Sequence, residues 1–216
     1  MGRELNAQVV AAFGRQYLVE TDSGEILRCV PRGKRSNVAC GDRVRIETTG
    51  AKEGVIETIE PRSSLFMRAA GHRQKIIAAN VTQVVVVVAG VPSFSDELIA
   101  RALVAAEQQH LRSVIALNKA DLVEETAAAR ERLKPFELAG YRVLELSAKR
   151  SVAPLVDVLE GHTTVLLGQS GMGKSTIVNT IVPDADAATQ EISTFLDSGR
   201  HTTTHARLYR LGPDTA

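Results

Sequence analysis

Eight residues near the C-terminal end constrain this chain more than any other feature, because they match the phosphate-loop pattern G-x-x-x-x-G-K-S at every fixed position. They are Gly168, Gln169, Ser170, Gly171, Met172, Gly173, Lys174 and Ser175. Residues 165–167 predict an apolar strand before the loop, and residues 175–181 predict a helix after it. Such a loop turns backbone N–H groups toward phosphate oxygens at the N-terminus of a helix. We assign these residues and Thr176 to a nucleotide site, in which Lys174 reaches the β- and γ-phosphates and Ser175 binds Mg²⁺.

From about residue 80 onward, the chain alternates between strand and helix patterns. Apolar runs predict strands at 84–89, 113–117 and 143–146, besides the one before the phosphate loop. Helical spacing predicts helices that begin after Ser95 as N-cap, at 124–138 and at 155–159. This alternation predicts a mostly parallel sheet covered by helices, so we interpret residues 80–216 as one α/β domain.

Residues 1–62 have a different pattern, in which short runs of strand-forming residues are separated by turn signals. The predicted strands are 8–13, 16–20, 25–30, 43–47 and 54–59. Five short strands without helical spacing predict a small closed barrel of either the OB or the SH3 type. Residues 63–79, which carry Arg68, His72, Arg73 and Lys75, are interpreted as a basic linker.

The composition excludes several classes of protein. With 44% hydrophobic and 24% charged residues, the chain is neither disordered, collagen-like nor a coiled coil. The longest apolar run, Val84–Ala89, is far too short for a membrane helix, and the chain does not open on a signal peptide. Cys29 and Cys40 are too few for a disulfide framework and too isolated for a zinc site. We therefore expect a cytoplasmic protein with reduced thiols and no membrane partner.

A formal net charge of +1 argues against nucleic-acid binding by bulk charge, so any RNA contact must come from a local patch. The candidate patch, around the end of the third predicted strand, consists of Arg28, Arg32, Lys34 and Arg35. OB-type barrels bind nucleic acid through a strand face and its flanking loops, where such side chains contact phosphates. From the residues alone, a solvated basic loop is an equally good interpretation.

Two further loops, each after a predicted strand, point to a guanine base. They are Asn118-Lys119-Ala120-Asp121 and Ser147-Ala148-Lys149. The Asp121 carboxylate can accept hydrogen bonds from the N1–H and 2-amino groups of guanine, whereas adenine offers neither donor. Lys119 could pack over the base, Asn118 could tie this loop to the phosphate loop, and the backbone of the second loop could contact guanine O6. The first loop alone is more often a simple turn, but three loops at the carboxyl ends of strands in one sheet favour a guanine site.

The order of these loops is informative, because the loop at Asn118 precedes the phosphate loop, whereas in ordinary small GTPases it follows. A circularly permuted chain can build the same sheet. With the segment Gly199-Arg200-His201-Thr202-Thr203-Thr204 and the barrel in front, the chain resembles the RsgA (also YjeQ or EngC) family of circularly permuted bacterial GTPases. Arg68 and residues 77–83 resemble that family's domain junction, although Thr82 stands where an aspartate is usual.

The resemblance implies an OB-fold first domain and an enzyme that hydrolyses GTP to GDP and phosphate with Mg²⁺. It implies stimulation by the small (30S) ribosomal subunit, a role in late maturation of that subunit, and rRNA and guanine nucleotide as partners. It also favours RNA as the partner of the basic patch. No feature of the composition demands a dimer, so we expect a monomer.

Residues 199–204 would be the first switch of such a GTPase. A threonine hydroxyl can complete the coordination of Mg²⁺ only while a γ-phosphate is present, and we choose Thr203 over Thr202 and Thr204. The family lacks the usual water-orienting glutamine, and the position that His201 matches is proposed to help instead, which makes His201 the candidate catalytic residue. An exposed loop histidine without a catalytic role is the alternative.

The sequence departs from the family in what it lacks. After Gly173 nothing matches the D-x-x-G element of the second switch, and the zinc ligands of the family's C-terminal domain are missing. We interpret the chain as an N-terminal portion of such a protein, with zinc expected only in the missing domain. Two alternatives stay open: a nucleotide-gated rRNA-binding module without catalysis, and an ATP-using P-loop enzyme in which Asp121 has no role.

Overall fold

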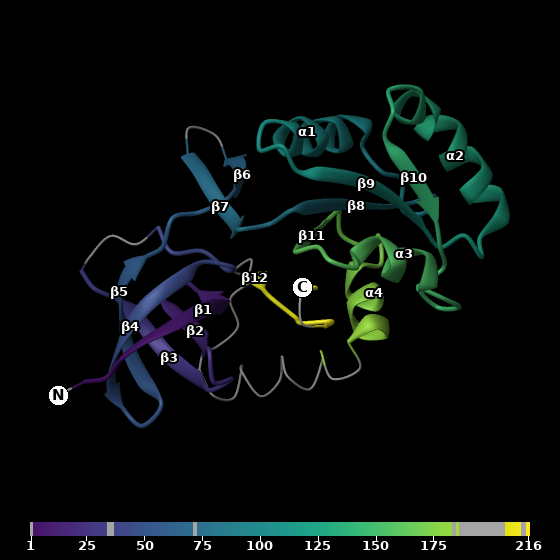
Figure 1. Ribbon diagram of the computed structural model, residues 1–216. Helices are drawn as coiled ribbons and strands as arrows, with labels where there is room; N and C mark the ends of the chain where they lie inside the picture. Colours follow the sequence, from purple (N-terminus) through teal and green to yellow (C-terminus); the bar gives the residue numbers. More distant parts are fainter. Residues whose placement is uncertain (1, 34–36, 71–72, 183–184, 186–205, 213–214) are drawn as a thin grey trace. The chain divides into compact units, whose positions relative to one another are not determined.

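The computed structural model describes residues 2–33, 37–70, 73–182, 185, 206–212 and 215–216 (Figure 1). The chain forms two compact units. The first contains the chain as far as Val81 together with residues 206–209, and the second contains residues 82–182 and 185 together with the described residues of 210–216. The main division along the chain therefore falls between Val81 and Thr82.

The first unit is built around a closed barrel of five strands. They are β1 (Glu4–Phe13), β2 (Gln16–Thr21), β3 (Ile26–Pro31), β4 (Arg43–Gly50) and β5 (Glu53–Ile59). The strands pair in the order β1-β2-β3-β5-β4, and β4 pairs again with β1 to close the barrel. The β3–β5 pair is parallel and the others are antiparallel. This is the strand order of an OB-fold, so pairing decides between the two barrel types that strand spacing left open.

Side chains along the barrel strands point alternately into and out of the barrel, and those that point inward form the core of this unit. Inward-facing apolar side chains are buried from every strand, among them Val9, Val19, Leu27, Ile46 and Ile56. A short strand from the end of the chain, β12 (Ala206–Arg207), pairs antiparallel with β1. The five barrel strands were all predicted from the sequence, whereas β12 was not.

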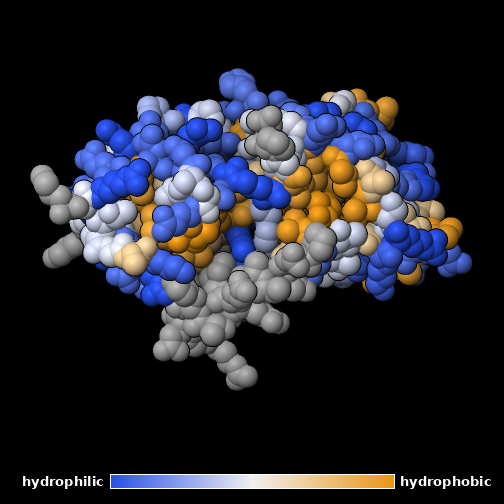
Figure 2. Space-filling model, turned by 60° about the horizontal axis from the view of Figure 1, so that its bottom comes forward, coloured by the Kyte–Doolittle hydropathy of each residue, from blue (hydrophilic) through white to orange (hydrophobic). Residues whose placement is uncertain are grey.

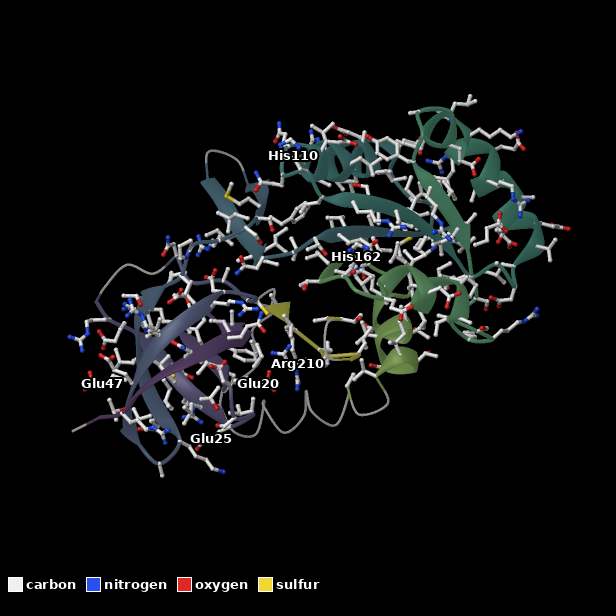
Figure 3. The ribbon with its side chains drawn as sticks, in the orientation of Figure 1. Glu20, Glu25, Glu47, His110, His162 and Arg210 are labelled. Carbon is white, nitrogen blue, oxygen red and sulfur yellow. The ribbon has the colours of Figure 1, made fainter. Side chains whose placement is uncertain are left out.

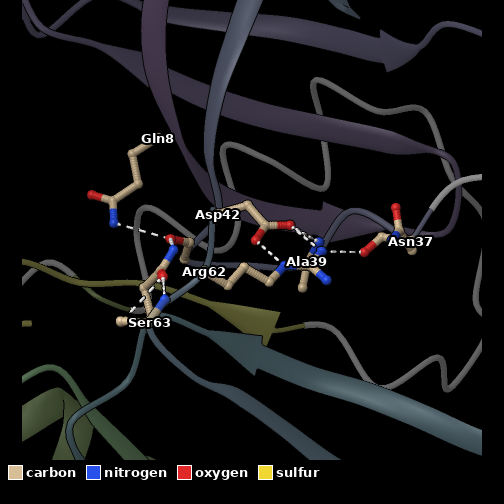
Figure 4. Close-up of polar contacts among 8 residues, drawn as sticks. Gln8, Asn37, Ala39, Asp42, Arg62 and Ser63 are labelled. Atoms are coloured by element: carbon tan, nitrogen blue, oxygen red, sulfur yellow. Dashed lines mark hydrogen bonds and ion pairs between the residues drawn. The ribbon is translucent and has the colours of Figure 1, made fainter. Parts of the chain in front are cut away.

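A buried ion pair joins the loop before β4 to the chain that follows β5 (Figure 4). The Asp42 carboxylate is fully buried and accepts hydrogen bonds from Nε and Nη2 of Arg62 at 2.7 and 2.8 Å. Its Oδ2 also accepts from the backbone N–H of Ala39 at 2.8 Å, and Arg62 Nη2 donates to the carbonyl of Asn37 at 2.6 Å. The buried carboxylate is therefore both paired and hydrogen-bonded, as buried charges in proteins generally are.

The predicted linker, residues 63–79, contains an antiparallel hairpin of β6 (Leu65–Ala70) and β7 (Arg73–Ala79). Its end is fixed within the first unit, because the Ala79 N–H donates to the carbonyl of Cys40 at 2.9 Å. Next to it, Nδ2 of Asn80 donates to the carbonyl of Gly41 at 3.0 Å. The domain bounds 1–62, 63–79 and 80–216 stay a prediction, although these contacts favour a boundary after Val81.

The second unit contains a sheet of four strands in which every pair is parallel. They are β8 (Gln83–Ala89), β9 (Arg112–Asn118), β10 (Arg142–Glu145) and β11 (Thr164–Leu167), in the order β10-β9-β8-β11. The chain moves outward from β8 to β10 and then returns to the other side of β8. The strand order thus reverses between β8 and β11, and open α/β sheets bind ligands outside the carboxyl ends of the strands at such a point.

Helices cover both faces of this sheet (Figure 1). They are α1 (Asp96–Glu107), α2 (Val123–Leu138), α3 (Ala153–Leu159) and α4 (Lys174–Ile181). Because parallel connections are right-handed, the two outward crossovers place α1 and α2 on one face, and the return to β11 places α3 on the other. Ser95 caps α1 as predicted, since its side chain accepts a hydrogen bond from the Leu98 N–H at 3.3 Å.

Burial differs between the central strand and its neighbour. All seven residues of β8 are buried, as its continuous apolar run predicts, whereas all four residues of β11 are half-buried.

Apolar side chains also gather on the face of the second unit that Figure 2 presents. Among the described residues, no helix combines the length and the apolar character needed to cross a membrane.

Candidate functional site

The phosphate loop, residues 168–175, joins β11 to α4 at the point where the strand order reverses. Gly168 has a φ of +147°, and a Cβ atom there would lie 2.3 Å from the carbonyl oxygen of Val87 in β8. Gly173 has a φ of +94°, and a Cβ atom there would lie 2.2 Å from Nδ2 of Asn118. Both positions require glycine, because any side chain would be strained and would also collide with its neighbour. The glycines thereby let the loop approach β8 and the end of β9.

The Lys174 side chain folds back over this loop. Its Nζ donates to the carbonyl oxygens of Gly168 and Gln169 at 2.8 Å each. Partial burial lowers the pKa of Lys174 below its usual value, because desolvation disfavours the charged form. A bound phosphate would favour the ammonium form again, so the proton on Lys174 and the anion should bind cooperatively.

We therefore expect nucleotide affinity to fall at alkaline pH. The pKa of Lys174 is lowered in the protein alone and should be higher with phosphate bound, so nucleotide affinity is complete below the first pKa and declines between the two. The loss should approach about tenfold per pH unit, the limit for one linked proton. Titrating fluorescent GDP between about pH 7 and 10 measures it, and Lys174→Arg is the control, since arginine keeps its charge throughout this range. An identical profile for both proteins would contradict the assignment to Lys174.

Asn118 connects three loops at the end of β9. The residue is 1% exposed, so its side-chain amide must form its hydrogen bonds within the protein. Nδ2 donates to the carbonyl of Met172 in the phosphate loop at 2.9 Å, and Oδ1 accepts from the N–H of Ala148 at 3.0 Å. The contact between Asn118 and the phosphate loop, expected from the sequence, is therefore present.

Asp121 presents a carboxylate beside the loop that follows β10. Oδ1 accepts a hydrogen bond from Oγ of Ser147 at 2.6 Å. This bond is the main cause that lowers the pKa of Asp121, with smaller contributions from the nearby positive charges of Arg150 and Lys149. The carboxylate is consequently ionised at neutral pH and can only accept hydrogen bonds, as pairing with the two donors of guanine requires.

The remaining residues of the two base loops lie around these groups. Lys119 has a φ of 65°, and its Nζ donates to the carbonyl of Val91 at 2.7 Å. The Ala120 N–H donates to the carbonyl of Leu146 at 3.1 Å. On the other side, Oγ1 of Thr180 in α4 donates to the carbonyl of Ala148 at 3.3 Å. The loops at 118–121 and 147–149 are thus bound to each other and to α4.

The residues predicted to bind Mg²⁺ or to act in catalysis are only partly described. Ser175 and Thr176 are exposed in the first turn of α4, directly after Lys174. A serine hydroxyl there is an oxygen ligand of the kind that Mg²⁺ prefers, so the residue present fits the ion. Thr203 and His201 lie outside the described residues.

Only Arg28 and Arg32 of the proposed RNA patch lie among the described residues. Nη2 of Arg32 lies 2.6 Å from Oε1 of Glu57 and 3.3 Å from Oε2 of Glu47, which Figure 3 labels on the barrel. Arg28 lies in β3, and Lys34 and Arg35 lie outside the described residues. Part of the charge of Arg32 is therefore neutralised by neighbouring strands, and its role in RNA binding stays a prediction.

Sequence reasoning missed the loop between β8 and α1, residues 90–95, which also borders the site. Oε1 of Gln169, in the phosphate loop, accepts a hydrogen bond from the Ser95 N–H at 2.8 Å. A Cβ atom on Gly171 would lie 3.1 Å from Cγ of Pro92. The only signal in the sequence is the position of residues 90–95 after a buried strand, a position that the loops at 118–121 and 147–149 share.

Comparisons with known proteins agree with this geometry. The family model of the RsgA GTPase matches residues 59–216. Two similar proteins are both named small ribosomal subunit biogenesis GTPase RsgA. The protein of Nitrosospira multiformis is 55% identical over 207 residues, which cover 96% of this chain and 66% of that protein. The protein of Nitrosomonas europaea is 51% identical over 218 residues, which cover 100% of this chain and 69% of that protein. The chain thus spans about two thirds of the length of these relatives.

Solved structures of similar fold support the topology. YjeQ from Thermotoga maritima matches with a TM-score of 0.65 and 30% identity over 84% of this chain and 66% of that chain. YloQ, described as a circularly permuted GTPase, matches with a TM-score of 0.61 and 28% identity over 85% of this chain and 66% of that chain. The predicted fold, an OB-like barrel followed by a circularly permuted α/β P-loop GTPase domain, is confirmed.

Proposed function

This chain belongs to the RsgA GTPase family, and on that premise we propose that its second unit binds guanine nucleotides for the hydrolysis of GTP to GDP and phosphate. The phosphate loop, residues 168–175, and Thr176 would hold the phosphates. The loops at 118–121 and 147–149 would hold the base. This arrangement uses the carboxyl ends of β9, β10 and β11, where a parallel sheet of this order binds its ligand.

The observation that carries the proposal is the position of Asn118. Its buried side-chain amide forms hydrogen bonds with both the phosphate loop and the loop after β10. The loops that would recognise the phosphates and the base are therefore held at a fixed distance from each other. Asp121, bonded to Ser147, supplies the two acceptors that guanine needs. An ATP site would have no use for that carboxylate, because adenine lacks both donors.

Magnesium and the first switch would complete the site. When bound at Ser175, Mg²⁺ would neutralise charge on the β- and γ-phosphates. Thr203 would add a hydroxyl ligand only in the GTP state and so sense the γ-phosphate. His201 would position the attacking water, which makes it the candidate catalytic residue of this chain.

The proposal also includes a role in the maturation of the ribosome. The relatives are named for biogenesis of the small ribosomal subunit, and we extend that role to this protein in late maturation of the subunit. In this proposal the 30S subunit stimulates hydrolysis, and the barrel contacts rRNA with Arg28, Arg32, Lys34 and Arg35. The protein would act as a cytoplasmic monomer.

Two measurements test this function. In competition against fluorescent GDP, unlabelled GDP and GTP should displace the probe, whereas ATP should not. Equal displacement by ATP would contradict guanine recognition by Asp121. Phosphate release should then rise when small subunits are added. Tight GTP binding without ribosome-dependent release would favour a nucleotide-gated rRNA-binding module without catalysis.

A further inference from the structure

The β8–α1 loop, residues 90–95, contacts the phosphate loop at two points. The Ser95 N–H donates to Oε1 of Gln169 at 2.8 Å, and Ser95 is at the same time the N-cap of α1. Pro92 packs so closely to Gly171 that a Cβ atom there would lie 3.1 Å from the proline Cγ. The phosphate loop is therefore held against a helix terminus by a side-chain hydrogen bond and by packing.

The same loop also contacts the loop that would hold the base. Nζ of Lys119 donates to the carbonyl of Val91 at 2.7 Å. At the start of the β8–α1 loop, a Cβ atom on Gly90 would lie 2.4 Å from the carbonyl oxygen of Glu125, so α2 packs directly against the backbone. Residues 90–95 thus contact both the phosphate loop and the loop at 118–121.

Arg132, on α2, contacts the end of this loop and the first residue of α1. Its Nη2 donates to the carbonyl of Phe94 at 2.8 Å and to Oδ1 of Asp96 at 3.0 Å, and its Nη1 donates to Oγ of Ser93 at 3.0 Å. The guanidinium also lies 4.0 Å from the centroid of the Phe94 ring, which is 5% exposed. A planar donor group that makes three hydrogen bonds and stacks on a buried ring fixes its partners firmly.

We propose that the β8–α1 loop is a positioning element for the nucleotide, with Arg132 and Gln169 as positioning residues that act in series. Arg132 fixes the position of Phe94, and the peptide bond between Phe94 and Ser95 thereby fixes the Ser95 N–H. This N–H in turn orients the Gln169 side chain in the phosphate loop. The N–H groups of a preorganised loop bind phosphate without first losing conformational freedom, which raises affinity. The proposal rests on the guanine-nucleotide site described above, but it assigns these two side chains a role that base and phosphate recognition alone do not require.

The test compares GDP with guanosine 5′-monophosphate, because only GDP carries a β-phosphate. In the full 216-residue chain, dissociation constants are measured for both ligands with Gln169→Ala, Arg132→Ala and the double variant. Loss of one positioning hydrogen bond should weaken GDP about 3- to 10-fold. The monophosphate should be weakened less, so the preference for GDP falls. Simple destabilisation of the fold would not change that preference, and thermal unfolding is followed in parallel.

Further variants make the outcome decisive. Lys134→Ala is the matched control, because Lys134 is also a cation on α2 but, among the described residues, forms an ion pair only with Glu131 one turn away. It should leave both constants unchanged, and Arg132→Lys should restore only part of the preference. Since the two residues act in series, the double variant should be no weaker than the weaker single variant. If the unaltered chain binds GDP but both single variants keep its preference for GDP, or if their effects simply add, the positioning role is wrong. If the unaltered chain does not bind GDP, the proposed function fails as well.

Discussion

Replacing Asp121 with asparagine should weaken GDP binding by about 100- to 1,000-fold, because one of the two hydrogen bonds to guanine is lost and the other is no longer charge-assisted. The carboxylate is ionised, since its pKa is lowered mainly by the hydrogen bond from Ser147. It can therefore accept from both the N1–H and the 2-amino group of guanine. An asparagine amide has the same shape, but its NH₂ group would face one of these donors and leave it unpaired.

The same substitution should improve binding of xanthosine diphosphate. Xanthine carries a carbonyl oxygen where guanine has its 2-amino group, so the asparagine NH₂ can donate to it while the amide oxygen accepts from N1–H. Displacement of a fluorescent guanine nucleotide, run with both diphosphates, measures the reversal. Asp157→Asn is the matched control, because Asp157 is an exposed aspartate on α3. A loss of GDP affinity below about threefold in Asp121→Asn would contradict base recognition by this residue.

Elements with a local signal could be predicted from the sequence. The phosphate loop was found because its glycines and lysine occur at fixed spacing between a strand and a helix, and the conformations of Gly168 and Gly173 explain why no other residue serves there. The strand at β8 was found because a strand buried on both faces shows a continuous apolar run. The N-cap at Ser95 was found because capping depends on residues within one turn.

Features that depend on distant pairing could not be predicted. The hydrogen bond between Ser95 and Gln169 joins residues 74 positions apart and exists only because β11 pairs with β8. The OB order required the parallel β3–β5 pair, which strand spacing does not reveal. For the same reason, the ion pairs of Arg32 with Glu47 of β4 and Glu57 of β5 could not be predicted, because the sequence around Arg32 shows only a run of basic residues.

The hairpin of β6 and β7 was missed for a different reason. Its basic residues give the segment the composition of a solvated linker, although Leu65, Phe66 and Met67 form a short apolar run that is compatible with a strand. The strands pair with each other along the register from Leu65↔Ala79 to Ala70↔Arg73. Basic residues are compatible with strand pairing, so a high content of them does not by itself indicate a linker.

Replacing Asp42 with alanine should lower the free energy of unfolding of the barrel by about 3–5 kcal/mol, the usual cost of removing one partner of a buried ion pair. Asp42 is fully buried, and the Arg62 side chain is only 16% exposed, so its guanidinium would lose its carboxylate partner in a poorly hydrated position (Figure 4). The Ala39 N–H would lose its acceptor in the same step. Hydrogen exchange of the β1 and β4 amides reports on the barrel separately from the second unit.

The double variant Asp42→Ala/Arg62→Ala distinguishes a stranded charge from a simple loss of packing. Removing Arg62 as well abolishes the unpaired cation, so the double variant should be more stable than Asp42→Ala alone. Asp22→Ala is the control, since Asp22 is exposed in the turn after β2 and should cost less than about 0.5 kcal/mol. If the two effects instead add, or if Asp42→Ala costs no more than the control, the ion pair contributes little. The chain after β5 would then be attached to the barrel by other hydrogen bonds, among them those from the Ala79 N–H to the Cys40 carbonyl and from Nδ2 of Asn80 to the Gly41 carbonyl.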